Sequence, residues 1–244
     1  MDNKKVVIYL ILFSLVFGAC QKEYIIGDKE YKILGSSARD LLTSSPYSLL
    51  KIEIDYMPGY APDTTSVNKL VIFLNSYLNK PSGIQVFQHQ ISASDKTVLS
   101  LADIVSLEKR NRNIYTENNV VAVHILITNG DYSEPNILAT SYWNTSFCIF
   151  GKTVENNSGG IGQISRASLT ATLFEHEFGH LLGLVGQGSP MQKEHRDLSN
   201  GAHCSNPFCL MYADVETSSN GNTGNNIPSL DADCISDLKA NGGK

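Results

Sequence analysis

The segment Val120–Ile127 constrains the fold of this chain more than any other part of the sequence. It is apolar throughout except for His124. A strand that is apolar along its whole length is typical of the centre of a parallel sheet, where helices cover both faces. The segment therefore predicts a buried central strand in a layered domain.

Strand and helix patterns alternate around this segment, and no internal repeat interrupts them. Further strands are expected at residues 50–56, 84–91, 139–143 and 147–150, and helices at residues 64–79, 99–112, 168–182 and 231–239. Strands that alternate with helices form mixed or mostly parallel sheets. We expect an α/β fold with one domain over residues 46–244.

The composition is typical of a folded domain and argues against nucleic-acid binding. Hydrophobic residues make up 42% of the 244 residues, enough for a substantial core, and the net charge is −5. Without a basic excess the chain has no means of neutralising a phosphate backbone, so we expect no nucleic-acid partner.

The N-terminus has the pattern of an export signal. Two lysines precede the apolar stretch Val6–Phe17, whose length of about 18 Å as a helix is too short to span a membrane. The Gly18-Ala19 pair before Cys20 resembles the lipobox of bacterial lipoproteins, although Phe17 stands where leucine is usual. This resemblance implies a signal peptide over residues 1–19, a lipid on Cys20 and a location in the bacterial cell envelope, on either face of a membrane. An ordinary cleaved signal is the alternative.

The segment that follows is polar. Residues 20–45 are interrupted by Gly27 and Gly35, and this composition predicts a flexible stalk between lipid and domain.

One expected helix carries a metal-binding pattern. His176 and His180 are four positions apart and therefore lie on one helix face, where both imidazoles can bind a single ion. Glu177 lies beside the first of them and can act on water next to the metal without binding the metal itself. The H-E-x-x-H pattern indicates a zinc site with Glu177 as general base. Histidines that merely pack in a helix are the alternative.

The residues after this helix resemble a known family. Gly183 extends the motif to H-E-x-x-H-x-x-G, which resembles the start of the metzincin zinc-protease signature. Metzincins have a third histidine three residues later, where this chain has Gly186. Farther on, His203-Cys204-x₄-Cys209-x-Met211 is similar to the block that follows the glycine in archaemetzincins. The resemblance implies that His203 is the third zinc ligand, that Met211 forms a turn below the metal, and that residues 186–202 are an inserted surface loop.

The archaemetzincin pattern continues with a four-cysteine zinc site, which is incomplete here. Cys204, Cys209 and Cys234 fit it, and Asp231 stands at the remaining position. A carboxylate is an acceptable zinc ligand, so these four residues can hold a second ion. Because an exported protein can form disulfides, pairing among Cys148, Cys204, Cys209 and Cys234 is the alternative.

Other residues compete for the third position beside His176 and His180. His195 lies in the inserted loop and can reach back, or it is a solvated loop residue; Glu194 and Glu216 are weaker candidates. His124 is expected to be a core or edge histidine, and His89 to face solvent.

The resemblance implies a zinc metallopeptidase with a metzincin-like catalytic domain, an active-site helix and a C-terminal helix. We expect a peptide or protein substrate, a monomeric chain and a membrane association through the lipid on Cys20. The alternative is a non-catalytic, zinc-binding surface lipoprotein, in which four protein ligands close the metal site. An adhesion or immunity lipoprotein with an accidental H-E-x-x-H is a third alternative.

Overall fold

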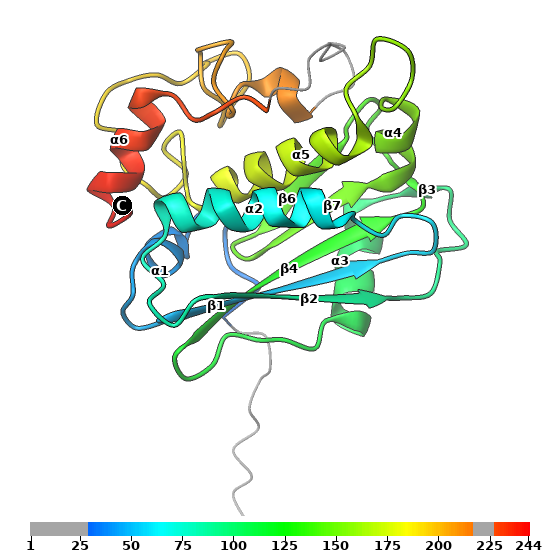
Figure 1. Ribbon diagram of the computed structural model, residues 1–244, viewed down its shortest axis with the longest axis horizontal. Helices are drawn as coiled ribbons and strands as arrows, with labels where there is room; N and C mark the ends of the chain where they lie inside the picture. The colour runs from blue at the N-terminus through cyan, green and yellow to red at the C-terminus, as the bar shows by residue number, and fades with distance from the viewer. Residues whose placement is uncertain (1–28, 217–226) are drawn as a thin grey trace, which may run out of the picture.

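A computed structural model describes residues 29–216 and 227–244. A five-stranded sheet forms the centre, with the strand order β2-β1-β4-β7-β6 (Figure 1). Its strands are β1 (Leu49–Tyr56), β2 (Ile84–Gln90), β4 (Val120–Thr128), β6 (Ala139–Trp143) and β7 (Ser146–Phe150). All neighbours are parallel except β6, which is antiparallel to β7. The predicted mixed, mostly parallel sheet is confirmed. Two short strands, β3 (Val98–Leu99) and β5 (Asp131–Tyr132), pair separately.

Helices cover both faces of this sheet. Those described are α1 (Ala38–Leu42), α2 (Thr64–Tyr77), α3 (Leu101–Asn111), α4 (Gly151–Asn156), α5 (Arg166–Leu181) and α6 (Ala232–Ala240), with a 3₁₀ turn at Ala213–Glu216. Asp63 begins α2 by accepting a hydrogen bond from the backbone N–H of Ser66, and Ser100 begins α3 with a capping box. In Figure 1, α2 and α5 lie side by side on one face and α3 lies on the other.

The two faces of the sheet have different chemistry. β4 is buried along its whole length, as its apolar run predicts. Alternate side chains such as Ile52 and Val123 enter the main core with α2 and α5, while their neighbours face α3. On the α3 side a smaller apolar cluster, which includes Leu107, Leu126 and Phe150, lies beside several buried charged groups.

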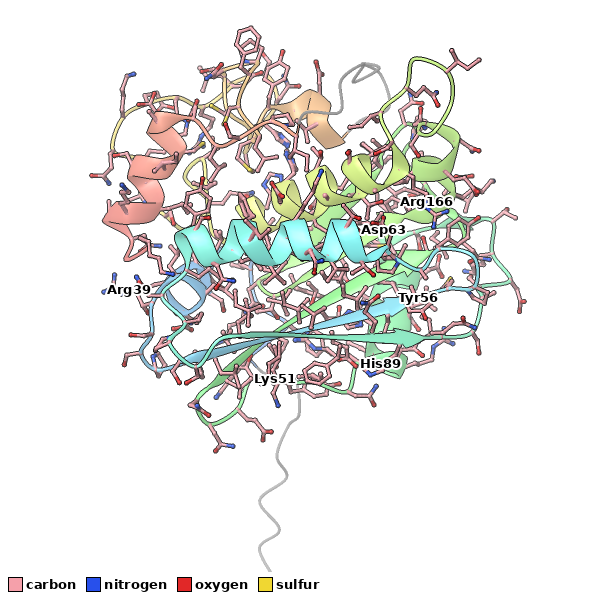
Figure 2. The ribbon with its side chains drawn as sticks, in the orientation of Figure 1. Arg39, Lys51, Tyr56, Asp63, His89 and Arg166 are labelled. Carbon is pink, nitrogen blue, oxygen red and sulfur yellow. The ribbon has the colours of Figure 1, made fainter. Side chains whose placement is uncertain are left out.

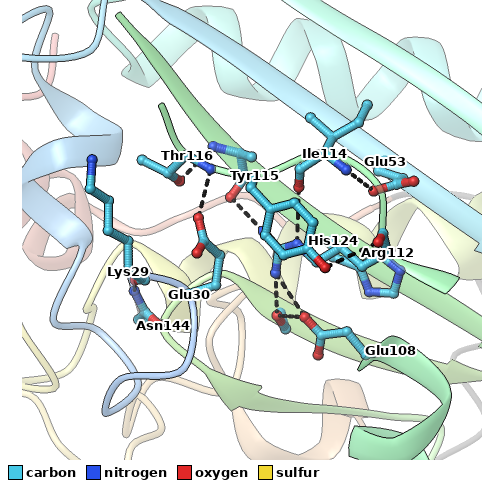
Figure 3. Close-up of polar contacts among 12 residues, drawn as sticks. Lys29, Glu30, Glu53, Glu108, Arg112, Ile114, Tyr115, Thr116, His124 and Asn144 are labelled. Atoms are coloured by element: carbon cyan, nitrogen blue, oxygen red, sulfur yellow. Dashed lines mark hydrogen bonds and ion pairs between the residues drawn. The ribbon is translucent and has the colours of Figure 1, made fainter. Parts of the chain in front are cut away.

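The predicted stalk is wrong for residues 29–45, because this segment packs on the domain. Leu41 and Leu42 of α1 are completely buried in the main core. The buried side chain of Asn144 holds the segment by accepting from the N–H of Lys32 and donating to the carbonyl of Lys29 and to Ser37 Oγ. Figure 3 shows the adjoining contact, in which the buried Glu30 accepts a hydrogen bond from the N–H of Thr116. Apolar burial and these hydrogen bonds outweigh the polar composition of the segment.

The predicted signal peptide (residues 1–19), the proposed lipid site Cys20 and the start of the predicted stalk lie outside the described residues. Within the described part, none of the helices has the length and apolar character that crossing a membrane requires.

Candidate metal centres

Helix α5, which carries the H-E-x-x-H motif, is buried along most of its length. Ser165 begins it by accepting a hydrogen bond from the N–H of Ser168, and every residue from Ser168 to Leu181 is buried. The helix ends before Gly183, which has a φ of +71°, a conformation that glycine adopts without steric cost. The helix therefore presents its motif residues inside the molecule, and the chain turns away directly afterwards.

Three histidines meet at the end of this helix. Nε2 of His176 lies 3.1 Å from Nε2 of His180, as expected for positions four apart on a helix. His203 approaches from the loop that follows, with its ring centroid 5.4 Å from that of His176 and 5.0 Å from that of His180. One nitrogen of each ring lies within 4.8 Å of the other two. The structure thus brings together the three residues that the sequence pattern named.

Backbone carbonyl groups orient two of these rings. Nδ1 of His176 lies 2.7 Å from the carbonyl oxygen of Leu210, and Nδ1 of His203 lies 2.7 Å from that of Asn200. A carbonyl group only accepts, so each Nδ1 is the donor, and in the neutral imidazole Nε2 then keeps its lone pair. This is how metal-binding histidines are held. The donor set fits zinc, which favours neutral imidazole nitrogens.

Glu177 is buried beside this cluster and is held by the edge strand β6. The hydroxyl of Ser141 donates to Oε2 of Glu177 at 2.6 Å and lies 3.3 Å from the carbonyl oxygen of the same residue. Sequence reasoning did not identify Ser141, since a single serine in an edge strand carries no local signal.

Met211 packs directly below the motif. It is fully buried, and a Cβ atom added at Gly179, inside the H-E-x-x-H segment, would overlap its sulfur. The carbonyl oxygen of Met211 accepts a hydrogen bond from the N–H of Cys204 at 2.7 Å, which ties the methionine to the residue after His203. The absence of a side chain at Gly179 lets the loop approach the helix this closely.

A second group of metal-ligating side chains lies nearby. Sγ of Cys204 lies 3.3 Å from Oδ2 of Asp231, and Sγ of Cys209 lies 3.7 Å from Sγ of Cys234. None of these cysteines forms a disulfide. Cys148, which the disulfide alternative included, is buried against the opposite face of the sheet and is likewise free.

His195 joins this second group and not the histidine cluster. Its Nδ1 lies 3.4 Å from Sγ of Cys204 and 3.9 Å from Sγ of Cys234, and its Nε2 lies 2.8 Å from Oδ2 of Asp237. His195, Cys204, Asp231 and Cys234 each place a ligand atom within 4.8 Å of the other three. Both interpretations of His195 are therefore wrong: its imidazole belongs to this second group and not to the histidine cluster, and it is buried and not solvated.

The thiols of this group are coupled by hydrogen bonds. The thiol of Cys234 and the N–H groups of Asp231 and Met211 donate to the sulfur of Cys209 and lower its pKa to about 7. Burial raises the pKa of Cys204 to about 12. Asp231 has a further role, because its Oδ1 accepts from the N–H of Cys234 and begins α6.

The remaining sequence candidates lie elsewhere. Neither Glu194 nor Glu216 belongs to the histidine cluster. His124 is fully buried with its Nε2 3.0 Å from Oδ2 of Asp55, and His89 is half-exposed, as predicted for both. The predicted insertion, residues 186–202, is an irregular loop that exposes Leu198 and buries Ser189.

Comparison with known proteins supports the fold. Neither a protein-family model nor a curated protein sequence matches this chain. The archaemetzincin of Methanopyrus kandleri matches 80% of this chain and 96% of its own, with a TM-score of 0.50 and 14% identity. Metalloproteinase-II of Bacteroides fragilis matches 82% of this chain and 55% of its own, with a TM-score of 0.41 and 12% identity. The first likeness shows an archaemetzincin-like fold.

Proposed function

We propose that this protein is a zinc-dependent metallopeptidase in which His176, His180 and His203 hold the ion. The observation that carries the proposal is the convergence of three imidazoles, two of them oriented by carbonyl groups, on the helix that also bears Glu177. The archaemetzincin-like fold is consistent with this assignment. The chemistry that zinc supplies in such a site is Lewis acidity toward a carbonyl oxygen and a lower pKa for water.

The protein's own groups perform the proton transfers. Glu177 is assigned as general base: its carboxylate accepts a proton from the attacking water and returns it to the nitrogen of the leaving amine. The Ser141 hydroxyl, which donates to Oε2 at 2.6 Å, fixes the orientation of this carboxylate. Burial of α5 keeps bulk water from the base. Met211, packed against Gly179, is assigned to the supporting turn below the site.

The experiment combines zinc analysis with a peptide library whose cleavage is followed by mass spectrometry. Glu177→Gln is expected to keep its zinc and to cleave at least a hundredfold more slowly, while His203→Ala is expected to lose one equivalent of zinc. Glu155→Gln, on the exposed surface of α4, is the matched control and retains both properties. A zinc-loaded wild-type chain that cleaves no member of the library would favour the non-catalytic binding protein.

We also propose a second, structural zinc ion held by His195, Cys204, Asp231 and Cys234, with Cys209 adjacent. The carboxylate of Asp237, 2.8 Å from Nε2 of His195, orients this imidazole as outer carboxylates do in zinc sites. His195→Ala is then expected to lose one zinc ion and to keep the other together with peptidase activity near the wild-type value. An unchanged zinc content in this variant would refute the second ion.

The cellular location remains a proposal based on the sequence. A lipid on Cys20 would place the domain at the bacterial cell envelope. Growth with a radioactive fatty acid is expected to label the wild-type protein and not Cys20→Ala; equal labelling of both would refute the anchor.

A further inference from the structure

The face of the sheet that packs on α3 carries a group of charged side chains away from both centres described above. Glu53 and Asp55 extend from β1, His89 from the edge strand β2, and His124 from β4. The strand register places Asp55 beside His89 and Glu53 beside His124. Because their neighbours Ile52, Ile54 and Val123 enter the core with α5, these four side chains lie on the opposite face.

The two carboxylates and the exposed imidazole converge. Nδ1 of His89 lies 3.5 Å from Oε1 of Glu53 and 3.5 Å from Oδ1 of Asp55. Glu53, Asp55 and His89 each offer a ligand atom within 4.8 Å of the other two. The imidazole is 45% exposed, whereas both carboxylates are completely buried. Figure 2 shows His89 at the open edge of the sheet, which gives an ion in solution access to the group.

Surrounding groups hold the carboxylates in place. Glu53 accepts hydrogen bonds from the N–H groups of Asn113 and Ile114 at 2.9 and 2.8 Å. Figure 3 shows Glu53 bound to Ile114 in this way, with His124 nearby. Nε2 of His124 lies 3.0 Å from Oδ2 of Asp55, so it orients this carboxylate as outer groups orient metal ligands.

The basic groups that contact these two carboxylates are the imidazoles of His89 and His124. Arg112, the buried cation on this side, makes an ion pair with Glu108 at 2.7 Å. Oδ1 of Asp55 is buried and has no hydrogen-bond partner in the described part of the chain. Two buried carboxylates two residues apart on one strand repel each other, and such charges are stable only when paired or bound to a metal. A divalent cation between them removes this repulsion.

The spacing fits an ion better than a direct hydrogen bond. Nitrogen–oxygen distances of 3.5 Å exceed the usual 2.7–3.2 Å of a hydrogen bond. Two ligands bound to one ion at about 2.1 Å in tetrahedral geometry are separated by about 3.4 Å. We propose that Glu53, Asp55 and His89 form a binding site for a divalent first-row metal ion, with His124 as a positioning residue. One imidazole and two carboxylates suit Mn²⁺ or Zn²⁺. Unlike the second metal centre, this site contains no cysteine.

Manganese tests this site separately from the proposed peptidase centre. Purified full-length protein is first loaded with two equivalents of zinc, the number that the two zinc centres proposed above take up, and is then titrated with Mn²⁺, while the unbound ion is followed by electron paramagnetic resonance. The wild-type chain is expected to bind one Mn²⁺ in addition to its zinc. His89→Ala and Asp55→Asn are expected to weaken this binding at least tenfold. Gln85→Ala, on the same strand and face, is the matched control and is expected to bind as the wild type does.

His89→Ala decides the outcome, because its side chain is half-exposed and its removal leaves the core intact. Circular dichroism confirms that each variant is folded. Equal Mn²⁺ affinity of His89→Ala and Gln85→Ala, or no Mn²⁺ bound by the zinc-loaded wild type, would overturn the proposal. In His176→Ala the Mn²⁺ site is expected to persist although peptidase activity is lost, so failure of one assignment leaves the other testable.

Discussion

Replacing Gly179 by alanine tests how tightly α5 packs against the loop that carries Met211. In an exposed helix this change would stabilise the protein by up to about 1 kcal/mol, because alanine has the higher helix propensity. Here the added Cβ would overlap the sulfur of Met211, and Cε of the same side chain lies 3.1 Å from the Cβ position. Met211 is completely buried, so its side chain can turn away only by displacing the residues packed around it. Overpacking of this kind costs about 1–3 kcal/mol.

The two effects have opposite signs, and the depth of the overlap decides between them. We expect Gly179→Ala to lower the free energy of unfolding by about 1–2 kcal/mol in urea titrations followed by circular dichroism. In a Met211→Ala background the overlap is gone, so the same change is expected to be neutral or stabilising by up to about 1 kcal/mol. A Gly179→Ala protein at least as stable as the wild type would show that the reasoning is wrong.

Three further predictions concern other contacts. Ser141→Ala removes the hydrogen bond to the Glu177 carboxylate, and we expect kcat to fall roughly tenfold with zinc content unchanged; an unaltered kcat would exclude a positioning role. Burial lowers the pKa of Lys80 from 10.5 to about 8, so the unfolded chain binds more protons between these values. Stability is therefore expected to rise from pH 8 to pH 10.5 relative to Lys80→Met, and parallel pH profiles of the two proteins would contradict this. Asn144→Ala is expected to destabilise residues 29–37 locally by about 2 kcal/mol, seen as roughly thirtyfold faster amide hydrogen exchange there; unchanged protection would refute the anchoring role.

The layers of the fold could be predicted from sequence because their signals are local. The apolar run of β4 and the helical spacing of α5 each reflect burial of a continuous segment, and both elements occur where expected. The grouping of His176 with His180 follows from helix geometry alone. His203 could be placed beside them only through the resemblance of its surrounding cysteine and methionine pattern to archaemetzincins.

Contacts between distant segments could not be predicted in this way. Leu41 and Leu42 are two apolar residues in a polar segment, too short a pattern to reveal that the core buries them. His195 lies in a polar loop whose composition indicates exposure. It is buried because Asp237 and Cys234 of α6, a helix distant in the sequence, pack against it. The bond between Ser141 and Glu177 likewise joins residues from separate elements.

If Cys20 carries the proposed lipid, the packing of residues 29–45 on the domain also limits how far the domain can lie from a membrane. Asn144 holds the chain at Lys29, so the residues between Cys20 and Lys29 set the largest distance between that lipid and the domain. A fully extended chain of this length spans about 30 Å, which is about the diameter of a small domain. The domain would therefore work close to the bilayer surface, and substrates would have to come to it there.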